Sequence, residues 1–183
     1  MELEIKEIEN KIYHKCSLSE DEHLKLIKIL KTGDKSSKIY IARLISRIGD
    51  QNDLKYILDL LSIKDPGLSL IEAVAVYGNS AVESIKKILA DRGKNNKYIR
   101  ENIIRVFVFL CKYLKRDEVS DYFITYLDDN YSGVRKACIH GFEKLNLIES
   151  VDKIQNLIEK ENDVGVKKYA VEVFNKLKPN SNL

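Results

Sequence analysis

Apolar residues recur along this chain at helical spacing, and several of the helices they predict share one pattern. From Val134 to Leu145, the apolar positions are Val134, Cys138, Ile139, Phe142 and Leu145. The same pattern returns from Val166 to Leu177, and an upstream copy begins at Ile99. Steps of three and four residues indicate amphipathic helices, and a period of about 20–50 residues is typical of stacked arrays.

A shorter apolar segment follows each of these helices, so the chain predicts a series of helical hairpins. The apolar positions of the second helices are Leu54, Ile57, Leu60 and Leu61; Val82, Ile85, Ile88 and Leu89; Val119, Phe123, Tyr126 and Leu127; and Val151, Ile154, Leu157 and Ile158. Upstream first helices are predicted from Ser37 to Gly49 and from Asp65-Pro66-Gly67 to Gly78, with short connections at 50–52 and 79–80. One hairpin cannot cover its own apolar faces, so neighbours must stack.

The two ends of the chain differ from the regular hairpins. Residues 2–15 predict one helix, and Ser19 followed by Glu22 is a capping-box pattern that opens a second helix to about Lys31. We predict a single domain over residues 1–183, with a capping hairpin in 1–33, regular repeats in 34–177 and a frayed tail in 178–183. The last repeat helix is expected at about 164–177, with no second helix to cover it.

The repeated segments resemble HEAT repeats, in particular the short HEAT-like type first named for phycobilisome lyases. The resemblance rests on acidic turns before a valine–basic pair, on small residues within the helix and on a leucine near its end. These residues are Asp128-Asp129-Asn130, Val134-Arg135, Ala137 and Leu145, and then Asp163, Val166-Lys167, Ala170 and Leu177. The resemblance covers about residues 34–177, and it departs where Lys38 and Lys167 replace arginine and where Gly67 removes the basic group.

This resemblance implies an all-α fold, a right-handed α-solenoid of about five stacked antiparallel helical hairpins. It also implies that the first helices form the convex face and the second helices line the concave face. The basic residue of the pair, at Arg100 and Arg135, has two interpretations: contact with phosphates, or pairing with acidic groups of the turns. We favour pairing, because a basic group beside turn aspartates at regular intervals is what a stacking contact between repeats requires.

Composition and charge exclude several classes of protein. The 183 residues include 31 basic and 28 acidic side chains, for a net charge of +3, which is small for a protein built to neutralise phosphates. The N-terminus is charged, without the apolar core of a signal peptide, and no apolar run reaches the length of a membrane span. We therefore expect a cytoplasmic protein without membrane contact, whose thiols Cys16, Cys111 and Cys138 are free.

No catalytic constellation emerges, and we predict no catalytic residue, no metal site and no cofactor. His14 and Cys16 are two positions apart, as are Cys138 and His140, so each pair would point in different directions on a helix. The chain lacks Cys-x-x-Cys, His-Glu-x-x-His and a glycine-rich phosphate loop. Cys138 occupies a small-residue packing position, which favours a core role over a nucleophile.

The candidate partner-binding residues are the polar positions that remain on the second helices once their apolar residues are removed. They are Lys55, Tyr56, Asp59, Glu83, Ser84, Lys87, Asp121, Tyr122, Thr125, Asp152, Lys153 and Asn156. Both charge signs occur among them, and tyrosines are enriched in protein interfaces. Packing between repeats is an equally good interpretation of Tyr56 and Tyr122.

Three functions remain open. The first is a non-enzymatic protein-binding module that holds its partner on the concave face, such as an adaptor, a scaffold or a stand-alone inhibitor of the immunity-protein type. The second is nucleic-acid binding like that of HEAT-like DNA alkylation-repair glycosylases, with a possible anion-binding cluster at Lys86, Arg92, Lys94 and Lys97. The third is a bilin lyase subunit, as the family name suggests. The uncovered last helix also allows an end-to-end homodimer.

Overall fold

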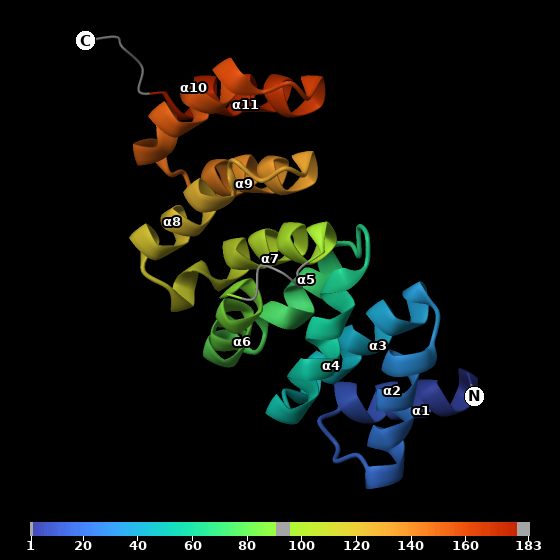
Figure 1. Cartoon of the computed structure of the whole chain (residues 1–183). Helices are drawn as coiled ribbons and strands as arrows, with labels where there is room; N and C mark the ends of the chain where they lie inside the picture. The colour runs from blue at the N-terminus through green and yellow to red at the C-terminus, as the bar shows by residue number, and fades with distance from the viewer. Residues whose placement is uncertain (1, 91–95, 179–183) are drawn as a thin grey trace. The chain divides into compact units, whose positions relative to one another are not determined.

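The computed structural model describes residues 2–90 and 96–178 (Figure 1). Helices make up 81% of the chain, and no strand occurs in the described residues, so the predicted all-α fold class is confirmed. The chain forms two compact units, Met1–Ile88 and Leu89–Leu183. None of the described helices is both long enough and apolar enough to cross a bilayer.

In residues 2–90, six α-helices and two short 3-10 turns are described, and the last helix runs past Ile88, where the first unit ends. They are α1 (Glu2–Tyr13), α2 (Glu20–Thr32), α3 (Lys35–Ile48), η1 (Gln51–Asp53), α4 (Leu54–Asp59), η2 (Leu60–Ser62), α5 (Leu68–Ala75) and α6 (Gly78–Ala90). Helix α3 packs against α1, α2 and α5, and α4 packs against α2 and α5. The core of this unit is aliphatic, with Leu26, Leu44, Ile45, Ile57 and Leu70 among its fully buried side chains.

The second unit contains five α-helices. They are α7 (Lys97–Leu110), α8 (Arg116–Tyr126), α9 (Ser132–Lys144), α10 (Val151–Lys160) and α11 (Val164–Leu177), with 3-10 turns η3 (Cys111–Tyr113) and η4 (Ile148–Ser150). Helix α9 packs against α7 on one side and α11 on the other, and Figure 1 shows these three helices side by side. Helix α8 packs against α7 and α9, and α10 packs against α11.

Local sequence signals explain where several helices begin. Ser19 accepts a hydrogen bond from the Glu22 amide, and the Glu22 side chain accepts one from the Ser19 amide, which confirms the predicted capping box. Asp34 and Asp163 cap α3 and α11, where their carboxylates accept hydrogen bonds from the amides of Ser37 and Val166. Gly49 ends α3 in the left-handed conformation, with φ of 76°.

The predicted boundaries of the helix that follows Asp65-Pro66-Gly67 were wrong at both ends. Pro66 lies outside α5, because Gly67, with φ of 79°, precedes the first helical residue, Leu68. The helix ends at Ala75, and Gly78 opens α6 rather than closing α5. Asn79 and Ser80 are therefore helical and do not form a connection. A glycine after apolar residues signals a turn, but it does not say which of two helices it belongs to.

Candidate functional site

The predicted partner-binding residues lie on α4, α6, α8 and α10, and each has an accessible side chain. Tyr56, Ser84 and Tyr122 are half-buried, and the other nine are exposed. Six belong to the first unit and six to the second. In the second unit, the buried hydroxyls of Ser120 and Ser150 are 3.3 Å apart, which places α8 beside the turn that leads into α10.

The two tyrosines of this set have different surroundings. The Tyr122 ring stacks on Phe107 at a centroid distance of 4.4 Å, so it joins α8 to α7 within one predicted hairpin and not between repeats. The Tyr56 ring has Lys31 Nζ at 4.8 Å and Lys55 Nζ at 4.9 Å from its centroid. Tyr56 therefore belongs to a small cationic patch, where a ring quadrupole attracts the ammonium groups.

The basic residue of the repeat pattern makes structural contacts. Arg100 donates to the two Asp129 carboxylate oxygens, from Nε at 2.6 Å and from Nη2 at 2.9 Å. Arg135 binds Glu161 at 2.7 and 2.6 Å and donates to the Asp129 carbonyl at 2.8 Å. Arg100 thus joins the start of α7 to the turn before α9, and Arg135 joins the start of α9 to the turn before α11. These two bidentate pairs confirm pairing over phosphate contact for Arg100 and Arg135.

Half of the predicted anion-binding cluster can be placed. Arg92 and Lys94 lie outside the described residues. Lys86 Nζ is 3.9 Å from a Glu83 oxygen, and Lys97 Nζ lies 5.2 and 4.9 Å from the ring centroids of Tyr98 and Tyr131. Both described lysines therefore have partners within their own surroundings.

The cysteines match their predicted environments. Cys138 is fully buried, and burial holds the pKa of its thiol well above the ordinary range. A buried thiol of this kind is inert, so the core interpretation of Cys138 is confirmed. Cys111 is partly buried and Cys16 is exposed, and all three are free thiols.

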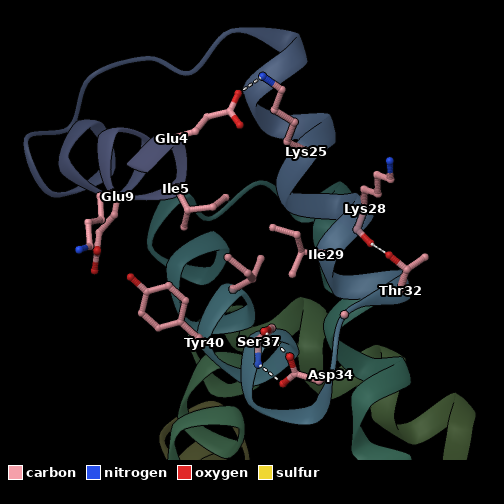
Figure 2. Close-up of a pocket in the computed structure, with 13 residues that line it drawn as sticks. Glu4, Ile5, Glu9, Lys25, Lys28, Ile29, Thr32, Asp34, Ser37 and Tyr40 are labelled. Atoms are coloured by element: carbon pink, nitrogen blue, oxygen red, sulfur yellow. Dashed lines mark hydrogen bonds and ion pairs between the residues drawn. The ribbon is translucent and has the colours of Figure 1, made fainter. Parts of the chain in front are cut away.

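A pocket that sequence patterns did not predict opens between α1, α2 and α3, with a volume of about 740 Å³ (Figure 2). Ile5, Ile29 and Ile41 supply its apolar lining. Charged residues also line it, among them Glu4 and Lys25, which form an ion pair. Burial, and then a hydrogen bond with Glu9, raise the pKa of Tyr40 in the same pocket to about 12. The pocket offers an apolar surface beside charges of both signs.

A second group of polar residues gathers where α2 meets η1. His23 Nε2 lies 3.0 and 2.9 Å from the two carboxylate oxygens of Asp53. Asp53 is only 1% exposed, and burial raises the pKa of its carboxyl although His23 acts in the opposite direction. Asp50 completes the group, since ligand atoms of all three residues lie within 4.8 Å of one another.

Spacing along the chain did not reveal this group, because histidines were compared only with near neighbours in the sequence. His23 and Asp53 are 30 positions apart and meet only because α2 packs against α4. The available signal was Asp53 itself, a charged residue directly before the buried Leu54. The expectation of no metal site was formed without this set, which only the fold brings together.

No protein-family model, no curated protein and no solved structure matches this chain.

Proposed function

We propose that this chain is a right-handed α-solenoid of HEAT-like hairpins that binds another protein through the exposed side of its second helices. The repeated contacts of Arg100 and Arg135 support the repeat architecture. Both arginines stand near the start of a first helix, and both bind a carboxylate in the turn before the next first helix. Equivalent contacts at equivalent positions are what stacked repeats require.

The observation that carries the binding proposal is the outer side of α8 and α10. Asp121, Thr125, Asp152, Lys153 and Asn156 are exposed there. Within the described part of the chain, these five side chains make no hydrogen bond or ion pair. Other exposed charges of the same unit form ion pairs. For example, Arg116 Nε lies 3.0 Å from Glu149 Oε1. We name these five residues the α8–α10 surface.

The charges of the α8–α10 surface favour a protein partner over nucleic acid. Asp121 and Asp152 would repel phosphates, whereas Lys153 and the neutral Thr125 and Asn156 suit a partner that offers both charge signs and hydrogen-bonding groups. A scaffold, an adaptor or an inhibitor of the immunity-protein type would all use such a surface. Partners of this kind are selected by complementary charge, which also raises the rate of association.

A pull-down with matched charge reversals tests the proposal. The full chain, Asp152→Lys and Glu172→Lys are immobilised and exposed to a lysate of the source cells, and captured proteins are identified by mass spectrometry. Asp152 and Glu172 are both exposed acids, on α10 and α11 of the same unit. We expect a protein that the wild type and Glu172→Lys capture equally and that Asp152→Lys captures at least about tenfold less, since an added like charge costs more than about 1.4 kcal/mol at a charged contact.

Two outcomes contradict the proposal. One is a captured protein whose recovery falls with Glu172→Lys and not with Asp152→Lys, since binding would then use α11. The other is recovery of nucleic acid in place of protein, with equal amounts from all three forms of the chain.

A further inference from the structure

We propose that His23, Asp50 and Asp53 form a binding site for a single zinc ion. The three residues come from α2 and from the turn between α3 and α4, so the fold brings the set together from segments that are apart in the chain. An imidazole nitrogen with carboxylate oxygens is a ligand set that Zn²⁺ accepts in proteins. This site is separate from the α8–α10 surface and does not depend on the protein-binding proposal.

The distances suit a zinc ion after a small adjustment. Tetrahedral zinc with bonds of about 2.0–2.1 Å holds its ligand atoms roughly 3.3 Å apart. His23 Nε2 and the Asp53 oxygens already lie 2.9–3.0 Å apart. The whole set spans at most 4.8 Å, and Asp50 is only half-buried, so its side chain has room to approach.

Asp53 has one partner for two buried carboxylate oxygens in the part of the chain that the structure describes. Its side chain is 2% exposed, and in the described residues its two oxygens share one hydrogen-bonding group, His23 Nε2, which carries at most one proton. Buried charges are ordinarily paired, hydrogen-bonded or bound to a metal. Zinc would bind the lone pair of a deprotonated His23 Nε2 and would supply two positive charges to two carboxylates.

The Tyr77 hydroxyl is a second buried polar group near these carboxylates. The tyrosine is 4% exposed, and its hydroxyl has no hydrogen-bond partner in the described structure. After burial, the charges of Asp53 and then Asp50 are the causes that raise its pKa, so this hydroxyl lies within electrostatic reach of both carboxylates. A buried hydroxyl without a partner costs free energy, and a metal-bound water would satisfy it.

An entry path to the site is present. His23 and Asp50 line a pocket of about 680 Å³ between the start of α2 and the end of α3. Three protein ligands leave a fourth zinc position for water, and this pocket would supply that water. Cys16 lines the same pocket, so a test must separate the proposed ligands from this exposed thiol.

Metal titration of the untagged full chain tests the site. The chelator-treated chain is titrated with Zn²⁺ against a chromogenic chelator, and with Co²⁺ to observe the visible bands of tetrahedral coordination. We expect one ion per chain, proton release on binding, a higher melting temperature with Zn²⁺ and no such effect of Ca²⁺, which prefers oxygen ligands.

Four variants assign the ligands. His23→Gln and Asp50→Asn should each weaken zinc binding by at least about tenfold, since even second-sphere changes cost 10–100-fold. Asp50→Asn keeps an oxygen that can accept a hydrogen bond from the Asn52 amide, so it preserves the turn. This variant therefore tests the zinc ligands even if His23→Gln fails to fold. Cys16→Ser removes the thiol that lines the same pocket, His14→Gln removes the histidine two positions before it, and both should leave binding unchanged. Absence of stoichiometric zinc binding, or binding lost in Cys16→Ser or His14→Gln and kept in Asp50→Asn, would overturn the proposal.

Discussion

At the residue scale, the bidentate pair of Arg135 and Glu161 joins α9 to the turn before α11. Glu161 has a side chain that is 2% exposed, and Arg135 is 16% exposed. Glu161 also accepts a hydrogen bond from the Asp163 amide at 2.8 Å, so the pair fixes the turn that begins α11. Removing one member leaves the other charge buried without compensation.

We expect Arg135→Met to lower the free energy of unfolding by about 3 kcal/mol, because it leaves the buried Glu161 carboxylate without its cationic partner. Urea unfolding followed by circular dichroism measures this change. Lys25→Met is the matched control, since Lys25 and Glu4 are 48% and 45% exposed and such an exposed pair contributes little to stability. Equal losses in the two variants would contradict the structural role of Arg135.

The same pair predicts a dependence of stability on pH. Arg135 holds the pKa of Glu161 below its ordinary value of 4.5, so the folded chain binds this proton more weakly than the unfolded chain does. The stabilisation is present above pH 4.5 and is lost as the pH falls through the lower pKa of the folded state.

Glu161→Gln should therefore be less stable than the wild type at pH 7, and its stability should fall less between about pH 5 and pH 3. Unfolding curves at several pH values measure the difference between the two chains. A difference that is constant with pH would show that Glu161 titrates alike in the folded and unfolded chain.

At the element scale, α8 and α9 approach closely because Gly141 has no side chain. A Cβ at this position would lie 2.5 Å from two ring atoms of Phe123, which is itself fully buried and packs edge-to-face on Phe142. The ring cannot move away without disturbing a filled core. The glycine is therefore kept within α9 despite its poor helix propensity.

Gly141→Ala should lower the free energy of unfolding by about 1–2 kcal/mol, because overpacking outweighs the gain of up to about 1 kcal/mol in helix propensity. Gly165→Ala in α11 is the control, since the added Cβ would meet only the exposed Asp163 carboxylate, at 3.3 Å. It should be neutral or slightly stabilising in the same thermal or urea unfolding experiment. A stabilised Gly141→Ala chain would contradict the packing of α8 on α9.

The helices themselves could be predicted from the sequence, because each depends on spacing within one segment. The final helix, expected at about 164–177, is observed at Val164–Leu177, and the Ser19 capping box forms as its local pattern predicts. The start of α5 was wrong because Pro66 and Gly67 favour a turn without fixing which residue follows it in helical conformation. The His23–Asp53 contact could not be predicted at all, since it depends on how α2 packs on α4.

At the scale of the whole molecule, the charge balance argues against nucleic acid as the partner. The net charge of the chain is +3, and the α8–α10 surface carries two carboxylates. Phosphate neutralisation by several cations would give affinity that falls steeply with salt.

We expect only weak binding of single- or double-stranded DNA in fluorescence anisotropy, with little change between about 50 mM and 200 mM salt. Lys153→Glu serves as a check, since it should not alter this weak binding. Tight binding that falls by about 10³-fold or more over the same range would instead support the basic cluster as a phosphate-binding surface.

Site-specific photo-cross-linking tests the central claim, that a protein partner binds the second helices, most directly. A photoreactive amino acid is placed at residue 152 on α10 or at residue 172 on α11, both exposed positions of the second unit. The chain is then irradiated inside the cells that produce it. We predict a discrete protein cross-link from residue 152 and none from residue 172. Cross-links from residue 172 alone, or equal and diffuse cross-linking from both positions, would contradict the claim.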